Sequence, residues 1–95
     1  MLIFEWNQEK RRANLEKHGV SFEEAGSVFY DEHAIQFFDE LHSEAEDRFF
    51  MLGVSEQLRI LVVIHSEAEI EGIIRIISAR KETARERKHY KGPKL

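Results

Sequence analysis

The sequence predicts one α+β domain, residues 1–95, in which helices flank a curved antiparallel sheet. Three observations lead to this fold class. The length of 95 residues suits a single domain. Two helix-start patterns occur early in the chain, and four short apolar segments separated by polar turns follow them. The expected order of elements is therefore β-α-α-β-β-β-β-α.

Capping patterns delimit the first two predicted helices. Asn7 is a favourable N-cap residue and Gly19 is favourable just beyond a helix end, so a helix is expected between them. Ser21 and Glu24 have the spacing of a capping box, in which each side chain binds the other residue's backbone N–H. A second helix is therefore expected over about residues 22–30.

Five apolar segments bounded by polar residues are strand candidates. The connections between the last three are short enough for hairpins, which favours antiparallel pairing. The run LVVI lacks alternation, so both of its faces should be covered and its strand should be central in the sheet. The candidates are residues 2–6, 34–38, 48–54, 58–65 and 72–79.

A third capping-box spacing predicts the last helix. Thr83 and Glu86 open the segment TARERKHY, residues 83–90. This segment is almost entirely polar and can bury little surface. It is therefore either a solvated face or a binding face.

The composition and residue spacing argue against disulfides, thiolate catalysis, metal sites and membrane segments in this chain. The chain has no cysteine, which excludes a disulfide framework and a thiolate nucleophile. None of the five histidines forms an HxH or HxxxH pair, so neither a metal nor a cofactor is expected. There is no apolar run of about 18 residues, and the start MLIFEWNQEK does not read as a signal peptide. We therefore expect a cytoplasmic protein that does not bind membranes.

The formal net charge of −4 hides an uneven distribution. Residues 21–72 carry two basic and thirteen acidic side chains, whereas residues 73–95 carry eight basic and two acidic ones. Lysine and arginine neutralise phosphates, and tyrosine can stack on a base. The basic end therefore suits nucleic acid, although a solvated helix that docks on an acidic partner explains the same composition. Its residues are Arg80, Lys81, Arg85, Arg87, Lys88, Tyr90 and Lys91.

The first predicted helix places four polar residues on one stripe, at positions i, i+4, i+7 and i+8. This stripe is either a binding surface or a solvated face whose histidine benefits from the negative end of the helix dipole. The four residues are Lys10, Asn14, Lys17 and His18.

Arg75 is unusual because it lies within an apolar strand candidate. Strict alternation places it on the sheet face opposite Ser78. An arginine is rarely buried without a partner, so Arg75 either pairs with an acidic side chain or lines a groove. Arg48 and Arg80 lie at the ends of their strands, where a side chain can reach a cleft.

These residue types can cleave RNA. The reaction needs a base that deprotonates the 2′-hydroxyl, cations that stabilise the pentacoordinate phosphorane, and an acid that protonates the leaving 5′-oxygen. Histidine, lysine, tyrosine and arginine can supply all three without a metal ion.

Four stretches of the chain match one known family: FEWNQEKRRANLEKHGVSFEEA, EDRFFMLGVS, LRILVVIHSE and IRIISARKETARERKHY. They resemble BrnT-type toxins, the ribonuclease partners in BrnT/BrnA toxin–antitoxin systems. KHGVSFEEA and RIISAR are the most specific of them, and Asn7 stands where the family usually has aspartate. Since both residues cap helices well, this difference changes little.

The resemblance implies a RelE-like fold and a bacterial toxin that cleaves RNA and inhibits translation without a metal. It also implies a BrnA-like antitoxin with a ribbon-helix-helix part, and the complex would contact DNA only through this antitoxin. The resemblance is compatible with a toxin homodimer within a heterotetramer.

The resemblance also suggests site residues by position. His18, Arg75, Arg80 and Tyr90 are expected to be catalytic. The acids of the loop LHSEAEDR are expected to orient Arg48. The residues expected to bind RNA are Lys17, Arg48, Lys81, Arg85 and Lys88.

Two other functions explain the same residues. The chain can be a non-catalytic binding module in a DNA-binding repressor complex, or a dimer-forming scaffold whose basic helix pairs with a neighbour's acidic loop. Expression of the chain alone arrests growth only if it is a toxin.

Overall fold

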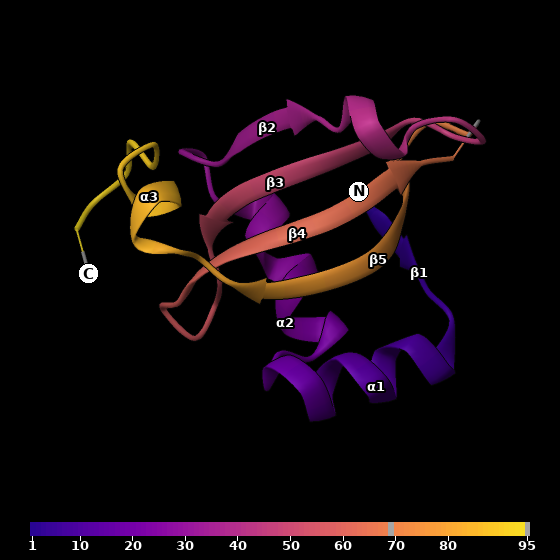
Figure 1. Ribbon diagram of the computed structural model, residues 1–95, viewed down its shortest axis with the longest axis horizontal. Coiled ribbons are helices and arrows are strands. Elements are labelled where there is room, and N and C mark those ends of the chain that lie inside the picture. The colour runs from indigo at the N-terminus through magenta and orange to yellow at the C-terminus, as the bar shows by residue number, and fades with distance from the viewer. Residues whose placement is uncertain (69, 95) are drawn as a thin grey trace.

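The computed structural model describes residues 1–68 and 70–94, which form five strands and three helices (Figure 1). In chain order the elements are β1 (Ile3–Glu5), α1 (Gln8–His18), α2 (Phe22–Ser27), β2 (Ile35–Phe38), β3 (Arg48–Val54), β4 (Ile60–Glu67), β5 (Ile73–Lys81) and α3 (Ala84–Arg87), with 3₁₀ turns at Val28–Tyr30 and Glu40–His42. The strands form one sheet in the order β1-β5-β4-β3-β2. Helix α1 runs alongside β5, and α3 lies near the end of the sheet at which β3 and β5 finish.

The predicted α+β class is confirmed. Strands β2 to β5 form an antiparallel meander, and β4, which contains LVVI, is central. Strand β1 differs, because it pairs in parallel with β5 over three residues. Its direction depends on how α1 and α2 return the chain across the sheet, and no local sequence pattern encodes that path.

The expected caps of α1 and α2 are present. The Asn7 side chain accepts a hydrogen bond from Lys10 N at 3.0 Å, and Ser21 Oγ accepts one from Glu24 N at 3.0 Å. Gly19 ends α1 in the left-handed region, with φ at 69°, where a residue without a Cβ has no steric penalty. These local signals therefore predict where both helices begin and where α1 ends. Helix α2 ends at Ser27, and a 3₁₀ turn over Val28–Tyr30 forms the rest of the expected segment 22–30.

The last helix is shorter than expected. Its capping box is formed, because Thr83 N donates to Glu86 Oε1 at 2.8 Å and Glu86 N donates to Thr83 Oγ1 at 3.1 Å. Helix α3 nevertheless ends at Arg87. The following residues leave the helix because Tyr90 packs against the sheet, which the polar pattern of this segment did not indicate.

Two apolar clusters lie on opposite faces of the sheet. The larger one joins α2 and its flanking residues to the sheet, and the smaller one lies on the face that α1 and α2 leave open, which we call the open face. The larger cluster contains Val20, Phe22, Ala25, Val28, Leu61, Val63, Ile76 and Ala79. The smaller one contains Leu52, Ile60 and Val62, with Phe50, Val54 and Tyr90 packed against it.

Asn14 attaches α1 to the edge of β5. Its Nδ2 donates to Ala79 O and to Val20 O, both at 2.9 Å, and its Oδ1 accepts from Ala79 N at 3.0 Å. The amide thereby satisfies the backbone of an edge strand beyond the point where β1 ends. Asn14 is therefore a buried structural residue, and the interpretation of its stripe as one continuous exposed or binding surface is wrong.

A β-bulge changes the side-chain pattern of β5. Ile64 of β4 pairs with Ser78, but its neighbour His65 pairs with Ile76, which leaves one extra residue on β5. An extra residue reverses the alternation beyond it. Arg75 and Ser78 consequently share the open face, and the expectation that they lie on opposite faces is wrong.

Candidate active site on the open face of the sheet

Two arginines occupy one cross-strand row of the open face. Arg48 of β3 and Arg75 of β5 both pair in register with Ser66 of β4, which lies between them. Two strand spacings, about 10 Å, therefore separate their Cα atoms. Folding thus places two guanidinium groups, 27 residues apart in the sequence, on one surface.

Among residues 1–68 and 70–94, the ion pairs of Arg75 are long and involve exposed acids. Its Nε lies 3.4 Å from Glu5 Oε1 and its Nη1 lies 3.6 Å from Glu46 Oε2. Exposed pairs of this kind contribute little, about 0–1 kcal/mol, so Arg75 can exchange these carboxylates for a phosphate. The acids of the loop before β3 were expected to orient Arg48, but the carboxylate of one of them, Glu46, pairs with Arg75 instead. The loop binds Arg48 through its backbone N–H, which donates to Ser43 Oγ at 3.0 Å.

Arg80 lines a small hollow further along the same face. It pairs in register with Val62, which pairs with Leu52. The hollow has a volume of about 150 Å³ and combines an apolar floor with polar groups from the C-terminal segment. The lining residues are Phe37, Phe50, Leu52, Val62, Arg80, Glu86 and His89.

Glu86 holds one edge of the Arg80 guanidinium. Arg80 Nη1 donates to Glu86 Oε1 and Nη2 donates to Glu86 Oε2, both at 2.8 Å. Nη1 also donates to Lys81 O at 3.2 Å. Among the residues that the structure describes, Nε of Arg80 has no acceptor, so the Nε–Nη2 edge keeps donors for a phosphate oxygen. The Arg80 side chain is about one-third exposed, which gives a ligand access.

The ion pair makes Glu86 an acid-sensitive contact. The hydrogen bonds from Arg80 lower the pKa of Glu86 to about 2, below its ordinary value of 4.5. A depressed carboxylate pKa stabilises the fold above the unfolded-state pKa, and this contribution is lost as the pH falls towards the folded-state pKa. We expect Glu86→Gln to lower the free energy of unfolding by about 1 kcal/mol at pH 6, a value reduced for solvent screening, and the difference from wild type to shrink steadily as the pH falls from the unfolded-state pKa towards about 2. Urea denaturation at several pH values measures this.

Glu16→Gln is the matched control, because Glu16 is an exposed carboxylate of α1. Its urea midpoint should follow that of the wild type at every pH. A Glu86→Gln variant that follows the wild type as closely as Glu16→Gln does would contradict the predicted contribution.

Tyr90 is bound through its hydroxyl. Its Oη donates to Asp31 Oδ2 at 2.7 Å, and the same carboxylate oxygen accepts from Val54 N at 2.8 Å. Burial and the Asp31 carboxylate raise the pKa of Tyr90 to about 12. This arrangement favours an anchor for the C-terminal segment over a group that exchanges protons near neutral pH.

The remaining predicted residues are spread around the molecule. Lys17 and His18 lie at the C-terminal end of α1, which runs along the edge of β5, and neither lines the hollow around Arg80. Lys81 pairs with Leu61 and so belongs to the face covered by the helices. Arg85 and Lys88 are exposed on and just after α3. Of the predicted residues, the structure thus brings Arg48, Arg75, Arg80 and Tyr90 onto one face, where the hydroxyl of Tyr90 is bound to Asp31.

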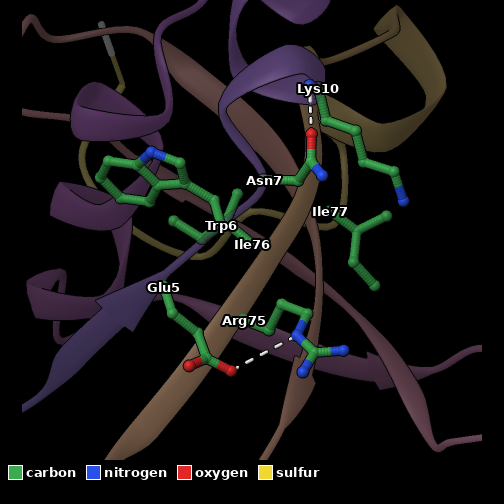
Figure 2. Close-up of a pocket in the computed structure, with 7 residues that line it drawn as sticks. All are labelled: Glu5, Trp6, Asn7, Lys10, Arg75, Ile76 and Ile77. Atoms are coloured by element: carbon green, nitrogen blue, oxygen red, sulfur yellow. Dashed lines mark hydrogen bonds and ion pairs between the residues drawn. The ribbon is translucent and has the colours of Figure 1, made fainter.

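A second hollow extends this face towards the start of α1. It has a volume of about 440 Å³ and is lined by Glu5, Trp6, Asn7, Lys10, Arg75, Ile76 and Ile77. Figure 2 shows Ile77 between the side chains of Lys10 and Arg75. Because Arg75 belongs both to this hollow and to the row with Arg48, cationic side chains continue from the open face around the bulge of β5.

Sequence reasoning missed His89 and the aromatic floor of the Arg80 hollow. His89 lies in a polar segment, and Phe37 and Phe50 lie in ordinary strand patterns. Only long-range pairing brings them to Arg80, so no spacing in the sequence could have indicated them. Within residues 1–68 and 70–94, no group of three or more His, Asp or Glu side chains is arranged to hold a metal ion. No helix in that part of the chain is long and apolar enough to cross a membrane.

Comparison with known proteins identifies the family. The family described as "Ribonuclease toxin, BrnT, of type II toxin-antitoxin system" matches residues 6–86. The chain belongs to the BrnT family. The crystal structure of the Brucella abortus ribonuclease toxin BrnT is similar to this BrnT-family chain, with a TM-score of 0.66 and 25% sequence identity, over 87% of this chain and 99% of the Brucella chain. No curated protein matches the sequence significantly.

The family assignment confirms the resemblance drawn from KHGVSFEEA and RIISAR. Proteins of this BrnT family are described as ribonuclease toxins of type II toxin–antitoxin systems, which implies RNA as the substrate and an antitoxin as the partner. The matched region contains Arg48, Arg75, Arg80 and Glu86 but ends before His89 and Tyr90.

Proposed function

We propose that this BrnT-family protein is a metal-independent endoribonuclease that cleaves RNA in the cytoplasm and thereby inhibits translation. The observation that carries the proposal is that Arg48, Arg75 and Arg80 share the open face and that Arg80 lines a hollow with an aromatic floor. Guanidinium groups bind phosphates and aromatic rings stack on bases. Such a surface suits a single RNA strand.

The proposed reaction is attack of a ribose 2′-oxygen on the adjacent phosphorus. The P–O5′ bond breaks, and the products are a 2′,3′-cyclic phosphate and a 5′-hydroxyl. Arg80 binds the scissile phosphate through its Nε–Nη2 edge and stabilises the negative charge of the phosphorane. Arg48 and Arg75 bind the neighbouring backbone phosphates, and Arg85 and Lys88 extend the cationic surface.

His18 and Tyr90 are two of the residues expected to be catalytic, and the geometry favours proton transfer by another group. Tyr90 is hydrogen-bonded to Asp31 and anchors the C-terminal segment. His18 ends α1 and is absent from the lining of the Arg80 hollow. We therefore assign the scissile phosphate to Arg80, and the proton-transfer group belongs to the residues that share its hollow.

The antitoxin that we propose is BrnA-like, with a ribbon-helix-helix part that contacts DNA on behalf of the complex. A basic open face gives this partner a surface to cover, and covering Arg48, Arg75 and Arg80 would block RNA. A chain without catalytic activity that served only as a co-repressor would not need an accessible Nε–Nη2 edge on Arg80.

Incubation of the purified protein with single-stranded RNA in EDTA tests the proposed function. We expect cleavage to proceed at the same rate with and without EDTA, and products that end in a 2′,3′-cyclic phosphate and begin with a 5′-hydroxyl. Expression of the wild-type chain alone should arrest growth, and Arg80→Ala should relieve the arrest. RNA that stays intact in every buffer, together with harmless expression, would contradict the proposal and favour the co-repressor.

A further inference from the structure

His89 shares the hollow of Arg80, and the proposed function leaves it without a role. Its side chain lines the hollow together with Arg80, Glu86 and the apolar floor. His89 itself is exposed, so a ligand in the hollow can reach its ring. Histidine is the side chain whose ordinary pKa is closest to neutrality, and it is the commonest general acid or base in enzymes.

The backbone of His89 is held from both sides. On one side, His89 N donates to the carbonyl oxygen of Glu86 at 2.9 Å, and the Glu86 carboxylate binds Arg80. On the other side, Tyr90 packs on the open-face cluster and donates to Asp31 at 2.7 Å. These two anchors connect the position of His89 to that of Arg80, although His89 lies outside the regular part of α3.

The ring of His89 also contacts the floor of the hollow. Its centroid lies 6.5 Å from that of Phe37, with an angle of 76° between the ring planes, which is an edge-to-face contact. Phe37 belongs to β2 and pairs in register with Phe50. An imidazole, a guanidinium and two phenyl rings from four separate segments therefore surround one hollow.

The other four histidines lie in different environments, and one of them, His18, is the last residue of α1. His65 is fully buried beside Phe29 and Phe49. His42 binds the Asp39 carboxylate through Nδ1 at 3.0 Å, and His33 lies 3.8 Å from Asp31. Among the residues lining the Arg80 hollow, His89 is the only one of this type.

We propose that His89 is the general base of RNA cleavage, an assignment that rests on the proposed ribonuclease function. A ring nitrogen of neutral His89 accepts the proton of the 2′-hydroxyl as the 2′-oxygen forms its bond to phosphorus. Arg80 stabilises the phosphorane, the P–O5′ bond then breaks, and the departing 5′-oxygen takes a proton from water. The imidazolium returns its proton to solvent, so the enzyme is restored.

The test compares His89→Ala with wild type and with His42→Ala, which removes an exposed histidine that does not line the hollow. We expect His89→Ala to lower the rate of RNA cleavage by about 100-fold or more, and His42→Ala to leave it unchanged. Affinity for a non-cleavable 2′-deoxy oligonucleotide should be similar for all three proteins. Thermal unfolding checks that each protein is folded, and His89→Gln, which keeps the polar side chain, should lose as much activity as His89→Ala.

Chemical rescue distinguishes proton transfer from a structural role. Imidazole added to His89→Ala should restore part of the lost rate in proportion to its concentration, and it should not accelerate the His42→Ala protein. Cleavage by His89→Ala at the wild-type rate, or lost cleavage that imidazole does not restore, would overturn the assignment while leaving the ribonuclease itself intact. A wild-type protein that leaves RNA uncut would instead contradict the proposed function and, with it, this role for His89.

Discussion

Arg80→Ala is expected to lower the rate of RNA cleavage by about 100- to 1,000-fold, the usual effect of removing one donor that stabilises transition-state charge. The guanidinium lines the hollow on the open face and keeps its Nε–Nη2 edge available, while Glu86 holds the other edge. Arg80→Lys keeps the charge but loses the planar fork. Its activity should therefore fall between those of Arg80→Ala and the wild type.

Arg80→Ala also breaks the ion pair between Arg80 and Glu86 that holds α3. This second effect of the substitution needs its own control. Glu86→Gln disturbs the same pair and keeps Arg80. If Arg80 acts on the phosphate, Glu86→Gln retains much more activity than Arg80→Ala. Arg12→Ala removes an exposed arginine of α1 and should leave the cleavage rate unchanged. Equal losses in Arg80→Ala and Glu86→Gln would show that displacement of α3, and not the missing guanidinium, explains the effect.

Arg59→Ala is expected to destabilise the fold by about 3 kcal/mol, because it leaves a buried carboxylate without its cation. Glu24 of α2 is almost fully buried. It accepts hydrogen bonds from Arg59 Nε at 2.9 Å, from Arg59 Nη2 and from Ser55 Oγ at 2.6 Å. The hydrogen bonds from Arg59 hold the pKa of Glu24 below its ordinary value. The free energy of unfolding, measured in urea at neutral pH, gives the size of the effect.

The neighbouring residue of α2 provides a matched control. Glu23 pairs with Arg11 at 2.8 Å, but both side chains are substantially exposed. Removing such a surface pair costs little, about 0–1 kcal/mol, so Arg11→Ala should be nearly as stable as the wild type. Adding Glu24→Gln to Arg59→Ala removes the uncompensated charge and should recover part of the lost stability. Similar effects of Arg59→Ala and Arg11→Ala would contradict the importance of burial.

Much of the fold can be read from local patterns. The caps at Asn7, Ser21 and Thr83 lie where the sequence places them, because a capping side chain binds a backbone group only three residues away. The apolar runs predict the strands of the meander, and the unbroken run in β4 predicts its central position. The family resemblance is local in the same sense, since it rests on contiguous stretches.

The candidate site depends on contacts between distant segments. The bulge in β5 brings Arg75 and Ser78 onto one face, and strict alternation could not anticipate it. Asn14 seemed a candidate for binding because of its stripe, yet its amide completes the edge of β5 at Ala79, 65 residues away. The hydroxyl of Tyr90 is occupied by Asp31, 59 residues away.

The sequence by itself determined where the helices begin, the strands and the presence of many cations near the C-terminus, because these follow from short-range hydrogen bonding and from the period of apolar residues. The tertiary structure alone decided which cationic side chains share one face of the sheet. Strand pairing puts Arg48, Arg75 and Arg80 on one face, and the Tyr90–Asp31 contact helps to hold His89 in the hollow that Arg80 lines. Pairing partners and register are set by the packing of the whole chain, so the composition of any one segment leaves them open.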